Sequence, residues 1–187
     1  MPIIKNQFGG KATIRTTANV TYALTAFSLP YDLQTGAVAI TGANVVGTGT
    51  TFTSNFANGA FVYATVNSTY GESRVINQVV NNTFMNVTSN WTAANATTTI
   101  NKAETIASLE ISSVTFTSNG TWSVYRGANT IVNLVGTHIF DFYARGQSLK
   151  EDGAAPLTMN LSASATGTLI LDVSKRVSTT NNQTTIG

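Results

Sequence analysis

Residues 108–146 read SLEISSVTFTSNGTWSVYRGANTIVNLVGTHIFDFYARG, and residues 156–176 read PLTMNLSASATGTLILDVSKR. Apolar side chains recur at every second position in both stretches. In the last run these are Leu169, Leu171 and Val173. Three groups of residues typical of turns punctuate the runs: Asn119-Gly120, Gly127-Ala128-Asn129 and Gly136-Thr137. A period of two, bounded by Gly and Asn, predicts antiparallel strands with one buried face.

The same pattern extends towards the N-terminus. Residues 12–30 predict two strands that end at Pro30, because proline lacks a backbone donor. Residues 37–91 predict five or six short strands joined by hairpin turns, arranged as a small barrel or sandwich. Residues 147–155 are the one helical candidate and are long enough only for a turn. The sequence therefore predicts an all-β protein made of antiparallel β-sandwich or β-barrel units.

The predicted domain boundary lies in residues 92–105, a small, polar stretch rich in Thr and Ala. This stretch is either an interdomain linker or one more edge strand. The predicted organisation is an N-terminal arm (1–11), an N-terminal β domain (12–102), a C-terminal β-sandwich domain (103–176) and a flexible C-terminal tail (177–187). The N-terminal arm, with Gly9-Gly10, is expected to fray in isolation or to become ordered on a neighbour.

The composition limits the classes of function. Only 10% of the 187 residues are charged, compared with roughly 25% in typical globular chains, and the net charge is +2. A polar but weakly charged surface suits a protein assembled against neighbours, and it disfavours nucleic-acid binding by charge. The chain has no Cys, so disulfide and thiol chemistry are excluded. The N-terminal residues do not resemble a secretory signal, and no apolar segment approaches the roughly 20 residues needed to span a bilayer. We therefore expect a soluble protein made in the cytoplasm, with no membrane partner.

No group of residues predicts catalysis. His138 is the single histidine, and no nucleophile elbow accompanies it. Asp141, Glu151 and Asp152 could serve a glycosidase or a calcium site, but Lys150-Glu151-Asp152-Gly153 is more simply a solvated turn. The segment 47–51 (GTGTT) lacks the Lys and the helix of a phosphate-binding loop. We therefore expect no catalytic residue, no cofactor and no metal.

Two further residue types were weighed for binding. The aromatic residues could form a sugar-stacking platform, although such residues more often lie in the core or at subunit interfaces. They are Trp91, Trp122, Tyr125, Phe140, Phe142 and Tyr143. Asn-x-Ser/Thr sequons such as those at Asn67 and Asn86 are expected by chance in a chain so rich in Asn and Thr.

Two stretches carry a resemblance to a known class. The first, ITGANVVGTGTTFTSNFANGAFVYATV followed by GESRVINQVVNNTFMNVTSNW, contains Gly47, Gly49, Phe52, Phe56, Gly59, Gly71, Glu72, Arg74, Val87, Thr88 and Trp91. This stretch resembles a small β module of tailed-phage virion proteins, with Ala60 where an acidic residue is usual. The second, VTFTSNGTWSVYRGANTIVNL with the closing strand GTLILDVSKR, resembles structural proteins of marine phages. Together the resemblances cover most of residues 37–176.

The resemblance implies a non-enzymatic virion component that is assembled in the host cytoplasm. The preferred interpretation is a capsid decoration (cement) protein that binds the outer capsid surface and stabilises the shell. Its partner would be the major capsid protein or another virion protein, and a homo-oligomer is expected, with a trimer as one arrangement. The alternatives are a tail, neck or fibre component, and a carbohydrate-binding module that contacts the host surface through Trp122 and Tyr125.

Overall fold

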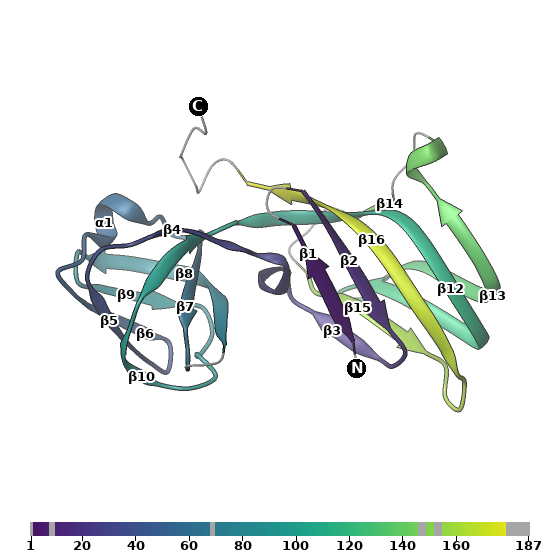
Figure 1. Ribbon diagram of the computed structural model, residues 1–187, viewed down its shortest axis with the longest axis horizontal. Coiled ribbons are helices and arrows are strands. Elements are labelled where there is room, and N and C mark those ends of the chain that lie inside the picture. Colours follow the sequence, from purple (N-terminus) through teal and green to yellow (C-terminus); the bar gives the residue numbers. More distant parts are fainter. Residues whose placement is uncertain (1, 8–9, 68–69, 146–148, 152–154, 179–187) are drawn as a thin grey trace. The chain divides into compact units, whose positions relative to one another are not determined.

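The computed structural model describes residues 2–7, 10–67, 70–145, 149–151 and 155–178. Among the described residues, 65% lie in strands and 6% in helices, so the protein is nearly all β, which confirms the predicted fold class. Two compact units are present, and each contains one curled antiparallel sheet that forms a half-barrel (Figure 1). Unit 1 comprises the described residues up to Phe27 together with 106–177, and unit 2 comprises residues 28–105 and Ser178.

The sheet of unit 1 is built on β12 (Ile106–Arg126), a strand of 21 residues. On one side, β12 pairs with β16 (Gly167–Val177) along its first part and with β15 (Leu157–Leu161) along its last part. The sheet continues from β16 to β2 and β1, and from β15 to β3. On the other side, β12 pairs with β13 and β14. The remaining elements are β1 (Ile3–Asn6), β2 (Lys11–Thr16), β3 (Val20–Tyr22), η1 (Leu24–Phe27), β13 (Asn129–Asp141), η2 (Tyr143–Arg145) and β14 (Leu149–Glu151).

Two of the three predicted turns in this region are irregularities within strands. Asn119-Gly120 lies inside β12 and Gly136-Thr137 lies inside β13, where the pairing of the two strands shifts register. A Cβ at Gly120 would lie 2.3 Å from Ser162 Oγ, and Gly136 has φ +88°, so both positions suit glycine for reasons other than a hairpin. The prediction of turns there was wrong, whereas Gly127-Ala128 does connect β12 to β13.

One face of this sheet forms the core of unit 1. Alternate residues of β12, β16 and β2 are buried on it, as the period of two predicts. The largest fully buried side chains of this face include Ile14, Phe27, Leu109, Ile111, Trp122, Leu157 and Met159. The opposite face carries hydroxyl and charged side chains around Asp172 and exposed apolar side chains on β13.

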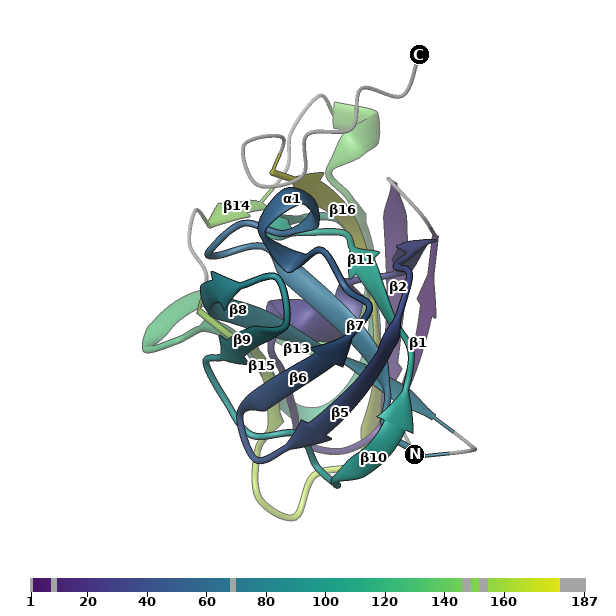
Figure 2. The same ribbon diagram turned by 90° about the vertical axis from the view of Figure 1, so that its left-hand side faces the viewer.

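Unit 2 contains a second sheet with the order β10-β5-β6-β9-β8-β7-β11-β4. The strands β10 and β11 lie far apart in this order, yet only Thr99 separates them in the chain. The sheet therefore curls around its core, which brings these two strands together (Figure 2). Its elements are β4 (Pro30–Leu33), β5 (Ala37–Thr41), β6 (Asn44–Thr48), the single-turn α1 (Phe52–Asn55), β7 (Phe61–Thr65), β8 (Gly71–Asn81), β9 (Phe84–Val87), β10 (Asn95–Thr98) and β11 (Ile100–Ala103). The core contains Val38, Ile40, Val45, Phe52, Phe56, Val62, Ile76, Met85, Trp91 and Ile100.

The domain organisation differs from the predicted one. Residues 12–27 belong to unit 1 with residues 106–177, because β2 pairs with β16 and β3 pairs with β15. Unit 2 is thus inserted into unit 1. The stretch 92–105 contains β10 and β11 and is therefore part of unit 2 rather than a linker.

The predicted N-terminal arm needs correction, whereas the structure describes only the first two residues of the predicted C-terminal tail. Residues 3–6 of the N-terminal arm form β1, which pairs with β2, whereas Met1 and residues 8–9 lie outside the described residues. Val177 is the last residue of β16, and residues 179–187 of the predicted tail lie outside the described residues. Across the described residues, no helix combines the length and apolar character required to cross a bilayer.

Candidate functional site

The polar face of unit 1 carries a row of five residues that lie directly opposite one another on adjacent strands. From β1 to β13, the row consists of Lys5, Thr13, Asp172, Ser113 and Asp141. Each residue belongs to the outward set of its strand, because alternate residues of a strand point to opposite faces. The row therefore brings together residues up to 167 positions apart in the sequence, and it places opposite charges at its two ends.

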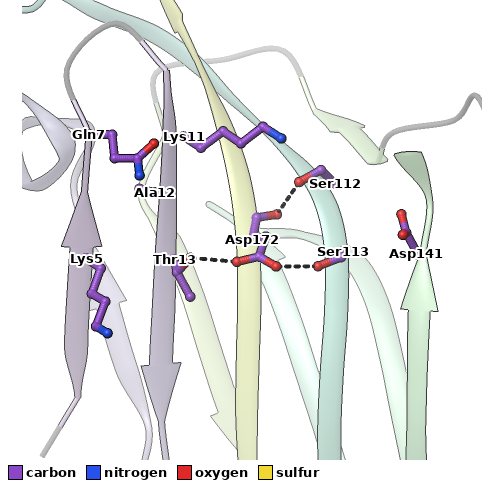
Figure 3. Close-up of a pocket in the computed structure, with 9 residues that line it drawn as sticks. All are labelled: Lys5, Gln7, Lys11, Ala12, Thr13, Ser112, Ser113, Asp141 and Asp172. Carbon is purple, nitrogen blue, oxygen red and sulfur yellow. Dashed lines mark hydrogen bonds between the residues drawn. The ribbon is translucent and has the colours of Figure 1, made fainter. Parts of the chain in front are cut away.

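Asp172 lies at the centre of this row and is held by hydroxyl groups from both neighbouring strands. Thr13 Oγ1 donates to Asp172 Oδ1 at 2.6 Å, and Ser113 Oγ donates to Asp172 Oδ2 at 2.6 Å (Figure 3). Ser112 Oγ donates to the backbone carbonyl of Asp172 at 3.0 Å. A register shift between Ile111 and Ser113 lets both serines reach the same residue of β16.

An open trough of about 420 Å³ lies over this face. Eight of its nine lining residues are polar or charged, and they include two ammonium groups, from β2 and its neighbour β1, and two carboxylates, from β16 and β13 (Figure 3). The lining residues are Lys5, Gln7, Lys11, Ala12, Thr13, Ser112, Ser113, Asp141 and Asp172. With equal numbers of both signs, the trough suits a polar partner of mixed charge better than a polyanion.

The two carboxylates of the trough already serve the fold. Asp172 accepts the two hydroxyl hydrogen bonds, and Asp141 Oδ1 accepts a hydrogen bond from the backbone N–H of Ala144 at 2.9 Å. The second contact stabilises the first turn after β13, where η2 begins. Hydrogen bonds of this kind fix the carboxylates in place. The site is therefore arranged for binding a polar group.

The predicted acidic grouping is only partly described by the structure. Asp141 lies opposite Ser113, and Glu151 lies opposite Leu109, so both flank the same side of β12. Asp152 lies outside the described residues. The described residues contain no cluster of three or more His, Cys, Asp or Glu side chains that could hold a metal ion.

His138 lies in a row of aromatic rings on the face of β13 opposite to the trough. Its ring centroid is 6.0 Å from that of Phe116 and 5.9 Å from that of Phe140, and Phe140 stacks on Phe142 at 6.2 Å. Ile139 lies on the other face, as the alternation predicts. The surroundings of this imidazole are aromatic, which agrees with the interpretation of His138 as a residue of a β-sheet face.

Two of the aromatic residues weighed for sugar stacking lie in the cores of the two units, which agrees with the alternative interpretation given for them. Trp122 is fully buried in unit 1 and Trp91 is buried in unit 2, so neither indole is available to a glycan. Tyr125 and Trp122 are three positions apart on β12 and therefore face opposite sides of the sheet. The prediction that Trp122 and Tyr125 act together is wrong for this reason.

The motif residues of unit 2 have structural roles. Glu72 accepts a hydrogen bond from the backbone N–H of Thr92 at 2.7 Å and forms an ion pair with Arg74 at 2.9 Å. Arg74 Nε donates to the carbonyl of Asn90 at 3.0 Å, and its guanidinium lies 5.5 Å from the Trp91 ring centroid. These contacts hold residues 90–92 against the sheet and cover the indole.

The predicted turn over the glycine-rich segment 47–51 is shorter than expected, because Gly47 and Thr48 are the last residues of β6 and only residues 49–51 connect β6 to α1. Gly49 has φ +69°, which favours glycine, and a Cβ at Gly47 would lie 2.2 Å from Thr50 Oγ1. Thr50 Oγ1 donates to the carbonyl of Asn82 at 2.6 Å, which joins this turn to the connection between β8 and β9. The segment therefore organises the fold of unit 2.

Comparison of the chain with protein-family models, with curated proteins and with solved structures gave no match. Arguments about function therefore start from the residues themselves. The row through Asp172 was missed by sequence reasoning, and the one local signal for it was Ser112-Ser113, a pair that interrupts the alternation of β12.

Proposed function

We propose that the chain is a non-enzymatic structural protein of a tailed-phage virion, and specifically a decoration protein that binds the outer capsid surface and stabilises the shell. The observation that carries the proposal is the trough of unit 1, a polar surface whose carboxylates are fixed by hydrogen bonds from Thr13, Ser113 and Ala144. Such a surface can recognise a neighbour through preformed polar groups without reorganising. The resemblance of residues 37–176 to virion β modules supports the virion assignment.

The trough suits an extended polar segment of the major capsid protein. Its volume of about 420 Å³ is in the range that accommodates several side chains of a partner. A basic residue of the partner would lie near Asp141 and an acidic residue near Lys5, at opposite ends of the same row. Charges arranged in this way set the orientation of a bound segment and disfavour a reversed one.

The first experiment is the number of copies per particle, measured by quantitative mass spectrometry of purified virions. Hundreds of copies in a fixed ratio to the major shell protein would support the decoration role. A handful of copies would replace that role with a tail, neck or fibre position. Absence from the particles would overturn both virion assignments.

The contact surface can be tested by adding the recombinant chain to particles assembled without it. Lys5→Glu reverses the charge at one end of the trough, and a roughly tenfold weaker binding is expected for the loss of one favourable charged contact. Arg15→Glu is the matched control, because Arg15 is an exposed cation of β2 that does not line the trough. Equal effects of the two variants would argue against the trough as the contact.

A further inference from the structure

The strand β13 is a long sheet edge that lacks protective Lys, Arg and Pro residues, although its pairing with β12 shifts register at two points. It contains 13 residues and, among the described strands, it pairs only with β12. Its sequence, NTIVNLVGTHIFD, has no Lys, Arg or Pro, although natural edge strands commonly use these residues to prevent pairing with other chains. Val135 is 65% exposed and Ile139 is 74% exposed, so apolar side chains lie beside the open backbone of this edge.

The other edge of the same sheet is protected. The strand β1 contains four residues and pairs only with β2 among the described strands. It is short and places Lys5 on the outward face, and both features oppose pairing with a further strand. Of these two edges, β13 is therefore the one suited to pairing with a partner.

The side chains of β13 are arranged almost symmetrically about Thr137. Val135 and Ile139 lie two positions before and two positions after Thr137, and both are on the outward face. Leu134 and Phe140 lie three positions before and three positions after Thr137, and both are on the opposite face. Gly136 directly precedes Thr137, and His138 directly follows it. An antiparallel pair of identical strands with its two-fold axis at Thr137 therefore matches apolar residues with apolar residues on both faces.

Two pairs of opposing residues support this register, one next to Thr137 and one four positions from it. Gly136 would lie opposite His138 of a second copy, and no heavy atom lies within 4 Å of the position of a Cβ on Gly136, so an imidazole has room there. Asn133 would lie opposite Asp141 of the second copy. Since Asn133 Oδ1 accepts from Ser123 Oγ at 2.7 Å, its amide nitrogen is the group that would donate to that carboxylate.

We infer that β13 is a self-association edge: two copies of the chain pair β13 with β13, antiparallel about Thr137, and form one continuous sheet. The near-symmetry of β13 favours a second copy of the chain as the partner, because pairing with an unrelated strand would not require a symmetric sequence. The contact is isologous and closes as a dimer, in contrast to the trimer considered from the sequence. The inference does not depend on the virion assignment, since it concerns the isolated chain.

Sedimentation equilibrium of the full chain tests the inference directly. The wild type is expected to be a dimer at micromolar concentration, and Ile139→Lys is expected to be a monomer, because each copy would place an ammonium opposite Val135 of the other. Ile3→Lys is the matched control, as Ile3 is also an exposed isoleucine (50% exposed) and lies on the protected edge β1. A monomeric or trimeric wild type would overturn the inference, and so would dissociation by Ile3→Lys.

Cross-linking gives a second, independent measurement. The chain has no Cys, so Thr137→Cys introduces a single thiol at the proposed axis. Antiparallel neighbours place their Cα atoms about 4.5–5.5 Å apart, which a disulfide can span. Thr137→Cys is expected to form disulfide dimers roughly a hundredfold faster than Val80→Cys, an exposed position of unit 2, because pairing raises the effective thiol concentration. Equal rates for the two variants would refute the proposed register, whatever the outcome of the virion experiments.

Discussion

Replacing Asp172 by alanine should destabilise unit 1 and leave unit 2 unchanged. In the native sheet the carboxylate accepts hydrogen bonds from Thr13 on β2 and Ser113 on β12, so it joins three adjacent strands on the polar face. The substitution removes both acceptors while keeping the backbone of β16. The two hydroxyl groups are left to water, since the site is only partly buried.

The expected cost is about 2 kcal/mol. A hydrogen bond to a charged group contributes about 1.5–3 kcal/mol in protein interiors, and partial exposure reduces this to about 1 kcal/mol for each of the two bonds. With an m-value of about 2 kcal/mol/M in urea, the unfolding midpoint of unit 1 would fall by about 1 M. Asp172→Asn keeps one amide oxygen as an acceptor and should show about half of this shift.

The two tryptophans allow the two units to be followed separately. Trp122 is buried in unit 1 and Trp91 is buried in unit 2, so Trp91→Phe and Trp122→Phe each give a chain with a fluorescent reporter in one unit. Asp172→Ala should shift the urea transition reported by Trp122 and leave the transition reported by Trp91 in place. A double-mutant cycle with Thr13→Val should give a coupling of about 1 kcal/mol.

Three results would refute this reasoning. The first is a change in the midpoint of unit 1 of less than about 0.3 M urea, which corresponds to well under 1 kcal/mol. The second is strict additivity of Asp172→Ala and Thr13→Val, which would mean that the 2.6 Å contact contributes nothing. The third is an equal shift of both transitions, which would show that the substitution does not act locally.

Three further predictions concern individual contacts. Gly71→Ala should destabilise unit 2 by about 2 kcal/mol in urea unfolding, because a Cβ would lie 2.3 Å from the Tyr63 hydroxyl oxygen. Arg74→Ala should red-shift the Trp91 emission and lower the stability of unit 2 by about 1 kcal/mol, because the guanidinium that covers the indole is lost. Burial, followed by two neighbouring carboxylates, raises the pKa of Tyr31, so the folded state favours the neutral phenol. Stability should therefore be fully present below pH 10.0 and decline as the pH rises through the folded-state pKa, and Tyr31→Phe should reduce this decline in urea titrations.

The alternation of apolar residues was sufficient to predict the fold class, but not the connectivity. A period of two determines which residues share a face, and it correctly placed His138 and Ile139 on opposite faces of β13. It does not determine which strands are neighbours. The pairing of β2 with β16 joins residues 159 positions apart, at Thr13 and Asp172, and no local signal encodes such a pairing.

The errors at the turns and at the aromatic platform have different causes. Asn-Gly and Gly-Thr pairs suit both tight turns and irregular strand positions, because each exploits the freedom of glycine, so the sequence could not distinguish these uses at Gly120 and Gly136. The error at Trp122 and Tyr125 was avoidable. Residues an odd number of positions apart on one strand face opposite sides, so the alternation itself excluded a shared platform.

Unit 2 is inserted into the chain of unit 1 between η1 and β12. The segments that enter and leave unit 2 lie side by side, because Ser28 Oγ donates to the carbonyl of Glu104 at 2.7 Å and the backbone N–H of Glu104 donates to the carbonyl of Leu29 at 3.0 Å. The buried Glu104 carboxylate also accepts from the backbone N–H of Leu29 at 3.3 Å.

The two ends of the inserted unit lie together, so it interrupts the chain of unit 1 at a single point. The strands β2, β16, β12 and β13 can therefore pair without a strand of unit 2 between them. The trough and the β13 edge are both properties of that uninterrupted sheet, whereas the Glu72, Arg74 and Trp91 contacts are complete within the inserted unit. It follows that substitutions on β13 or in the trough should alter association without altering the motif residues of unit 2. Self-association can accordingly be tested at Ile139 and partner binding at Lys5 without changing the contacts of unit 2, whereas Asp141 belongs to both the trough and the proposed β13 register.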